Sequence, residues 1–162
     1  MKEIMKEILK EARQLIDPDG VPQLLPWEYI YFNFFPEKRN LFFIDVGAYD
    51  GLRGSNTALF ELYLGWDGIC IEPNKSSYEQ LLKSRKCKTY NLCIGDKNTV
   101  GEFWEGDGGL AALSGLHDSL HNKHIDRIGN KYSKKQIEIR TLSSIMDDNN
   151  IINVDYLSID VE

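Results

Sequence analysis

Two apolar runs in the first half of the chain each carry an acidic residue at or near their end. The first run, residues 42–46, includes Asp45 and is followed by Gly47 and Gly51, whereas the second leads into Glu72. Glycines after a strand let the main chain turn sharply and approach a ligand, because they have no Cβ. A carboxylate 25 residues after the first glycine is placed to accept both hydroxyls of a ribose. The pattern predicts a nucleotide-like cofactor at the carboxyl edge of a parallel sheet.

Each half of this pattern has a simpler explanation when it is taken alone. A tight turn without a ligand would account for the glycines, and a solvent-exposed strand end would account for Glu72. The spacing of Gly47, Gly51 and Gly54 also differs from the GxGxxG pattern that wraps a pyrophosphate. We favour a ligand site because the loop and the acid occur together, and we expect the helix after the loop to direct free N–H groups at that ligand.

Composition narrows the class of protein. The chain has 162 residues, of which 42% are hydrophobic, so it can bury the core of one domain. Its formal net charge is −6 without a dense basic patch, which disfavours nucleic-acid binding. No apolar run approaches the roughly 18 residues that span a bilayer. The charged N-terminus does not fit a signal peptide, and the three cysteines lack CxxC spacing, so we expect reduced thiols and a cytoplasmic protein.

Periodicity predicts the elements that position these residues. Residues 2–16 have the pattern of an amphipathic helix, and the turn at 17–20 ends it. Beyond residue 41, apolar runs alternate with helical patterns, which predicts a mostly parallel sheet flanked by helices. The predicted core strands are 41–46, 68–71, 89–94 and 156–161, and the predicted helices are 55–64, 75–84 and 142–148. We expect additional strands at 100–104 and 136–140, the second antiparallel at an edge, with a long loop between them.

The chain divides at about residue 40. Residues 1–40 combine the first helix with an aromatic segment, because six of the nine residues at 27–35 are aromatic. We expect this segment to seat the first helix on the core, with a pocket or an interface as the alternatives. Residues 41–162 form the predicted cofactor-binding domain.

Five sequence blocks together resemble the FkbM family of S-adenosylmethionine-dependent methyltransferases. The blocks cover residues 43–51, 55–57, 71–74, 141–145 and 157–162. This resemblance implies a Rossmann-like methyltransferase fold with S-adenosylmethionine as the cofactor. It also implies methyl transfer to a hydroxyl oxygen of a sugar, glycan or polyketide-like acceptor, so the expected partner is a small-molecule or glycan acceptor. A nicotinamide-dependent oxidoreductase is the alternative that the absent GxGxxG pattern disfavours.

The resemblance also implies roles for individual residues. The implied cofactor-binding residues are Asp45, Gly47, Ala48, Gly51, Asn56, Glu72, Pro73 and Asp96. Asp45, Gly47 and Gly51 would surround the methionine part of the cofactor, Glu72 would hold the ribose, and Asp96 would contact the adenine amino group. Asp160 would lie near the transferred methyl and is the candidate catalytic base.

The polar segment 105–133 contains His117, His121 and His124, which have a spacing that could bind a metal on a helix. We expect a solvated loop without a metal there, since the segment is polar and flanked by glycines. These histidines are also weaker candidates for the base. The glycines in the same segment allow a movable lid over a substrate, or an ordinary surface loop.

The chain ends at Glu162, at the tip of a strand that this topology places in the middle of the sheet. We therefore expect a domain that is truncated after its fourth core strand and exposes an apolar edge. Homodimerisation through that edge, or through the aromatic segment, is the association that this predicts. A truncated module without catalytic activity, which binds the cofactor or serves in assembly, is the alternative function.

Overall fold

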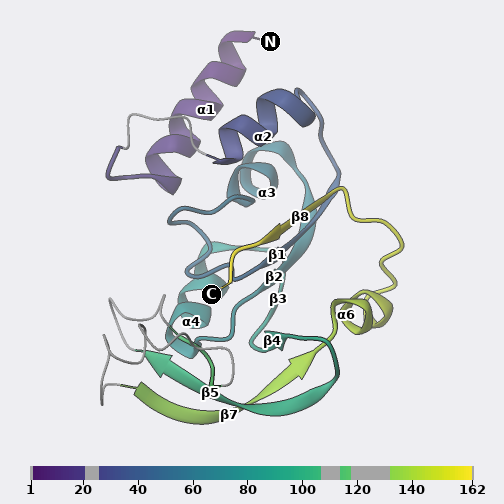
Figure 1. Ribbon diagram of the computed structural model, residues 1–162. Helices are drawn as coiled ribbons and strands as arrows, with labels where there is room; N and C mark the ends of the chain where they lie inside the picture. The colour runs from purple at the N-terminus through teal and green to yellow at the C-terminus, as the bar shows by residue number, and fades with distance from the viewer. Residues whose placement is uncertain (1, 21–25, 107–113, 118–131, 162) are drawn as a thin grey trace.

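A computed structural model describes residues 2–20, 26–106, 114–117 and 132–161. Its first sheet has four parallel strands in the order β3-β2-β1-β8 (Figure 1). The strands are β1 (Phe42–Val46), β2 (Asp67–Ile71), β3 (Lys88–Tyr90) and β8 (Tyr156–Ile159). The sheet grows outward from β1 through β2 to β3, and β8 then lies on the other side of β1. The order of the strands therefore reverses between β1 and β8, which is where ligands bind in open α/β sheets.

Helices cover both faces of the first sheet. Alternate residues of a strand point to opposite sides, and both sides of these strands carry apolar residues that must be buried. On one face, Phe43 and Cys70 join a buried cluster with the first helices of the chain. These are α1 (Lys2–Ile16), α2 (Pro26–Phe34), α3 (Ala58–Leu64) and α4 (Lys75–Ser84). On the opposite face, Ile44 and Ile71 pack with Ile145 of α6 (Leu142–Asp148). Continuous apolar strands are thus explained by burial on both faces, as the sequence pattern predicted.

The aromatic segment packs on the main core. Trp27 and Tyr31 are buried in one cluster with Phe43 and Phe60, and Ala12 of α1 belongs to it too. Other aromatic residues of the segment, at positions 29, 32 and 34, are more than half exposed. Two aromatic residues of the segment therefore share one buried cluster with α1 and the first sheet.

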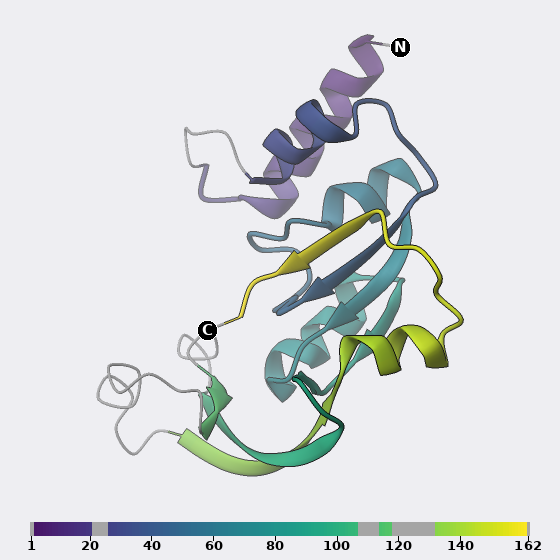
Figure 2. The same ribbon diagram turned by 45° about the vertical axis from the view of Figure 1, so that its right-hand side comes forward.

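A second, mixed sheet lies beside the first. It has the order β4-β7-β5-β6, and Figure 2 shows it curving below the first sheet. Its strands are β4 (Cys93–Ile94), β5 (Thr99–Gly106), β6 (Gly115–Leu116) and β7 (Tyr132–Arg140). As predicted, β7 pairs antiparallel with β5, but its predicted place at an edge was wrong, because β4 pairs parallel with its other side. The helix α6 then connects β7 to β8.

The single strand predicted at 89–94 was wrong, because the chain changes sheets within it. β3 ends at Tyr90 in the first sheet, and β4 begins at Cys93 in the second. Between them, the Asn91 side-chain amide donates to the carbonyls of Glu72 (2.8 Å) and Pro73 (2.9 Å). These bonds hold the turn against the end of β2, so the two short strands can belong to different sheets.

The helix predicted to begin at Ser55 begins instead at Ala58. Ser55 still satisfies its first donors, since its Oγ accepts the main-chain N–H groups of Thr57 (3.2 Å) and Ala58 (3.1 Å). Helices 75–84 and 142–148 were predicted with the bounds that the structure has. Among the described residues, none of the helices has the length and apolar character that a membrane crossing requires.

Candidate functional site

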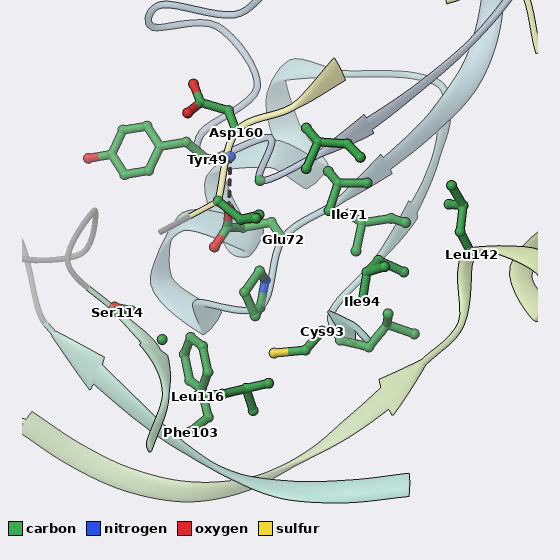
Figure 3. Close-up of a pocket in the computed structure, with 17 residues that line it drawn as sticks. Tyr49, Ile71, Glu72, Cys93, Ile94, Phe103, Ser114, Leu116, Leu142 and Asp160 are labelled. Atoms are coloured by element: carbon green, nitrogen blue, oxygen red, sulfur yellow. Dashed lines mark hydrogen bonds between the residues drawn. The ribbon is translucent and has the colours of Figure 1, made fainter. Parts of the chain in front are cut away.

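A pocket of about 510 Å³ opens at the carboxyl edge of the first sheet, where the strand order reverses (Figure 3). One wall comes from the ends of β1, β2 and β8 and includes Gly47, Glu72 and Asp160. The facing wall comes from the second sheet and includes Phe103 and Leu116. A concave, mostly apolar cavity with a few polar groups is typical of a small-molecule site. The position at the sheet edge is the one predicted from the sequence.

Glu72 is the most constrained acid in the pocket wall. Its Oε2 accepts the main-chain N–H of Tyr49 (2.8 Å), and its Oε1 accepts that of Asn74 (2.8 Å). Only 6% of the residue is exposed, and this burial raises the pKa of the Glu72 carboxyl to about 7, despite the two hydrogen bonds. A carboxylate has about four lone-pair sites. Glu72 can therefore still accept hydroxyl groups from a ligand in the pocket.

The glycine loop is bonded to the end of β2. The N–H groups of Gly47 (2.9 Å) and Ala48 (3.1 Å) both donate to the carbonyl of Ile71. Tyr49 then adopts a left-handed conformation with φ 51°, which is uncommon for a residue with a side chain and aims its N–H at Glu72. Gly47 and Tyr49 line the pocket, whereas Ala48 is buried behind them.

Asp45 lies beneath the pocket rather than in its wall. Its Oδ2 accepts the hydroxyl of Thr57 (2.6 Å), and burial raises the pKa of the Asp45 carboxyl. Asn56 lies close by, and its side-chain amide donates to Ser158 Oγ at 3.4 Å. The Asn56 Oδ1 is buried and has no hydrogen-bond partner within the described residues. Asp45 and Asn56 therefore lie outside the residues that line the pocket, and the Oδ1 of Asn56 is an acceptor without a donor in the described part of the chain.

Two predicted residues stand away from the pocket. Gly51 packs against α4, where a Cβ would lie 2.5 Å from Ser84 Oγ and 2.7 Å from Leu81 Cδ1. Asp96 is exposed in the turn between β4 and β5 and is not part of the pocket wall. Three N–H groups at the start of α3 are also not free, because the Ser55 hydroxyl accepts that of Ala58 and the Thr57 carbonyl accepts those of Phe60 and Glu61.

Asp160 and Pro73 line the pocket from the ends of β8 and β2. Asp160 is exposed at the pocket mouth, and its N–H donates to the carbonyl of Val46 (2.9 Å). The Pro73 carbonyl accepts a hydrogen bond from Lys135 Nζ (3.2 Å). The same Nζ also lies 2.7 Å from Glu105 Oε1. Through Lys135, the second sheet is fastened to the end of β2.

The sequence did not predict the apolar wall that the second sheet contributes. Phe103 and Leu116 line it together with Cys93, whose thiol has a pKa raised to about 12 by burial, and Leu142 of α6 also lines the pocket. Alternation along 99–106 could have shown that Phe103 faces one side of its strand. It could not show which side faces the pocket, because that depends on pairing between distant strands.

Two of the three histidines that could bind a metal, His121 and His124, lie outside the described residues. His117 is described, and its ring lies 4.9 Å from the Trp104 ring, centroid to centroid. Among the described residues, no group of three or more His, Cys, Asp or Glu side chains is placed to hold a metal ion.

The geometry defines an α/β protein with a nucleotide-sized pocket where its strand order reverses. A family model, the methyltransferase FkbM domain, matches residues 45–162, which is well over half of the chain. The chain therefore belongs to the FkbM methyltransferase family, as its sequence blocks predicted, and this family indicates methyltransferase activity. Searches of curated proteins and of solved structures found no match.

Proposed function

We propose that this chain binds S-adenosylmethionine in the pocket at the carboxyl edge of its first sheet. The observation that carries the proposal is the placement of Glu72, a buried carboxylate fixed by two main-chain N–H groups and facing the cavity. Its remaining lone pairs suit the two hydroxyls of a ribose. We also propose that the fold around the first sheet is Rossmann-like.

The residues present fit this cofactor in two respects. The cavity of about 510 Å³ lies within the range for small-molecule sites. The Gly47 main chain approaches the cavity without a side chain, and Pro73 lies beside Glu72 in the wall. The Asn56 Oδ1 is buried without a hydrogen-bond partner in the described part of the chain, but Asn56 lies outside the pocket wall, so its proposed role in cofactor binding rests on the family resemblance. Asp45 and Ala48 would support this loop from behind, whereas the Gly51 and Asp96 roles inferred from the family are the least supported by position.

We further propose that the methyl acceptor is a hydroxyl group of a sugar, glycan or polyketide-like molecule. The cofactor supplies a methyl group that is already activated by its sulfonium. What remains for the protein is to orient the acceptor and to remove its proton. Asp160 is the proposed acceptor of that proton, a role supported by its exposed position in the lining of the pocket.

Calorimetric titration with S-adenosylhomocysteine tests the cofactor proposal. We expect micromolar binding by the 162-residue chain, weakened at least tenfold by Glu72→Ala, which is about 1.4 kcal/mol. Glu79→Ala is the matched control, because Glu79 is exposed on α4 and outside the pocket wall. NAD should not bind. Equal affinities for wild type and Glu72→Ala would contradict the proposed role of Glu72, and absence of binding by a folded chain would contradict the proposal itself.

A further inference from the structure

Arg85 is a fully buried arginine at the end of α4, beneath the glycine loop. Its Nε lies 2.5 Å from Glu61 Oε2, and the side chains of the two residues are 0% and 8% exposed. The other oxygen of Glu61 accepts the main-chain N–H groups of Lys86 (2.6 Å) and Cys87 (2.9 Å). A buried charge is tolerated only when it is paired and hydrogen-bonded in this way. Glu61 thus accounts for one of the three nitrogens of the guanidinium.

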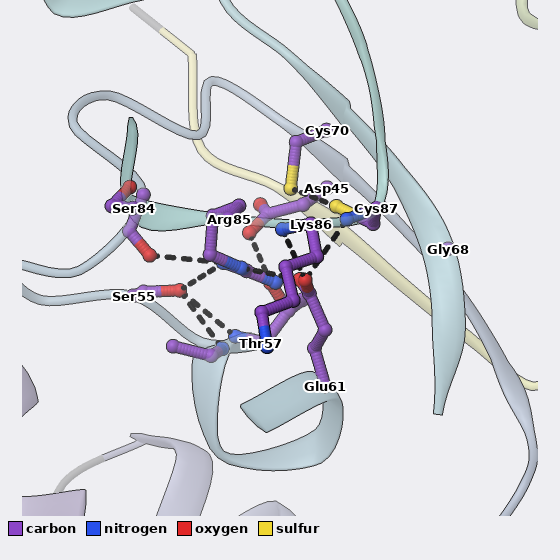
Figure 4. A network of polar contacts seen from close by, with 12 residues as sticks. Asp45, Ser55, Thr57, Glu61, Gly68, Cys70, Ser84, Arg85, Lys86 and Cys87 are labelled. Carbon is purple, nitrogen blue, oxygen red and sulfur yellow. Dashed lines mark hydrogen bonds and ion pairs between the residues drawn. The ribbon is translucent and has the colours of Figure 1, made fainter. Parts of the chain in front are cut away.

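The other two nitrogens bind the second half of the glycine loop (Figure 4). Nη1 donates to the Gly51 carbonyl (3.0 Å) and to Ser55 Oγ (3.3 Å), and Nη2 donates to Thr57 Oγ1 (3.0 Å). These three acceptors lie within seven consecutive residues, 51–57. One rigid guanidinium therefore fixes the carbonyl that ends the turn, the hydroxyl that caps α3 and the hydroxyl that contacts Asp45.

We propose that Arg85 is a positioning residue that holds the glycine loop in the conformation required for cofactor binding. The first half of the loop is held by the end of β2, through Ile71 and Glu72. The second half is held by Arg85, which does not line the pocket and so acts only through the loop. This inference rests on the proposed function, since it assumes that the pocket takes S-adenosylmethionine.

The chemistry of arginine distinguishes this role from simple charge balance. A lysine at position 85 could still pair with Glu61, but its single ammonium group cannot reach the three loop acceptors in the fork geometry of a guanidinium. If Arg85 only neutralises Glu61, Arg85→Lys should retain the cofactor affinity of wild type. If Arg85 positions the loop, Arg85→Lys should fold and still bind the cofactor poorly.

The first experiment measures S-adenosylhomocysteine affinity and thermal unfolding for Arg85→Lys and for the double variant Arg85→Met/Glu61→Gln. The double variant removes both buried charges together, so we expect it to fold even if Arg85→Met alone does not. We expect affinity to fall at least tenfold in both variants. Wild-type affinity in either folded variant would overturn the inference.

The second experiment follows amide hydrogen exchange in the free protein and does not depend on any ligand. We expect the amides of residues 47–57 to exchange at least tenfold faster in the double variant, with β1 and β2 unchanged. The matched control is Arg140→Met/Asp148→Asn, which removes another arginine–carboxylate pair (2.7 Å) outside the loop and should change neither exchange nor affinity. If wild type binds no S-adenosylhomocysteine, the proposed function fails, and exchange alone then decides the role of Arg85. Unchanged exchange in the loop would overturn that role.

Discussion

A side chain on Gly47 would overlap the main-chain carbonyl oxygen of Asp160. Gly47 has φ +84°, and a Cβ built on it points directly at that oxygen. The N–H of Asp160 donates to the carbonyl of Val46 (2.9 Å), so the end of β8 lies against the start of the glycine loop. The close approach of these two chain segments forms the side of the pocket where the candidate base and the candidate cofactor loop meet.

Gly47→Ala should therefore destabilise the protein strongly. The substitution combines a positive φ with overlap against the main chain, which cannot move as easily as a flexible side chain. We expect a loss of about 2–5 kcal/mol in the free energy of unfolding, measured by urea denaturation. A loss below about 1 kcal/mol would show that β8 can move away from the loop at little cost.

Gly54→Ala provides the matched control for this prediction. Gly54 also has a positive φ, +68°, but a Cβ there would meet nothing within 4 Å. We expect it to lose about 1 kcal/mol, from the backbone conformation alone. The difference between the two variants then measures the contact between Gly47 and Asp160.

The raised pKa of Glu72 predicts how stability depends on pH. The carboxyl has an ordinary pKa near 4.5 and a pKa of about 7 in the folded state, because it is buried. Between these two values the folded protein binds a proton that the unfolded chain has released, so stability falls as pH rises from 4.5 to 7. Glu72 contributes up to about 3 kcal/mol to this fall.

Glu72→Gln removes the titrating group, so its unfolding free energy should fall less with pH than that of wild type. The difference in unfolding free energy between wild type and Glu72→Gln should change steadily from pH 4.5 to 7 and stay constant above pH 7. Asp45, whose pKa is also raised by burial, is present in both proteins and cancels only in part, because the charges of Asp45 and Glu72 interact. Parallel pH profiles for the two proteins would contradict the assignment.

Cofactor binding should depend on pH in the opposite direction. Ribose hydroxyls donate to the carboxylate, so the ligand should prefer the ionised form of Glu72. If only that form binds, affinity for S-adenosylhomocysteine should be about tenfold weaker at pH 6 than at pH 8, because the competent fraction falls by that factor. Calorimetry in buffers of different ionisation enthalpy should detect proton release on binding at pH 6. Glu72→Gln should abolish both this proton release and the pH dependence of affinity.

Local patterns predicted most elements of the fold but not the second sheet. Strand 42–46 was predicted from its unbroken apolar run, and helix 75–84 from the helical pattern that follows strand 68–71. The structure adds a cap to this helix, since the Asn74 side chain accepts the N–H of Ser77. The split of residues 89–94 between two sheets depends on the bonds from Asn91 to the end of β2. Such bonds join residues far apart in the chain, so their effect does not appear in the local pattern.

A position in the pocket wall was predictable for residues that lie at the end of a strand. Glu72 and Asp160 both follow apolar runs, and the structure places both in the wall of the pocket. Arg85 follows a helix in a polar stretch, where a charged residue ordinarily indicates solvent exposure. Its burial results from Glu61, on another helix, and no local pattern links the two residues.

Asn74 joins the two sheets at the edge of the pocket. Its Nδ2 donates to the Gly106 carbonyl (3.0 Å) and to Ser114 Oγ (2.9 Å), while its Oδ1 accepts the N–H of Ser77 (3.0 Å) as the cap of α4. The residue is 1% exposed, so groups that lose these bonds have little access to water. One side chain therefore serves both as a helix cap and as a link to the second sheet.

Asn74→Ala should cost more stability than the loss of a helix cap alone. We expect about 2–4 kcal/mol in the free energy of unfolding, since a cap contributes about 1 kcal/mol, the buried Gly106 carbonyl loses the Asn74 donor, and the Ser114 hydroxyl keeps only the N–H of Gly106 (2.9 Å). Thr141→Ala is the control, because Thr141 Oγ1 caps α6 through the N–H of Ser144 (3.1 Å) and should cost only about 1 kcal/mol. Asn74→Asp keeps the cap and removes the donors, so it should also be less stable than wild type. Equal losses for Asn74→Ala and Thr141→Ala, measured by urea denaturation, would mean that the link to the second sheet contributes nothing.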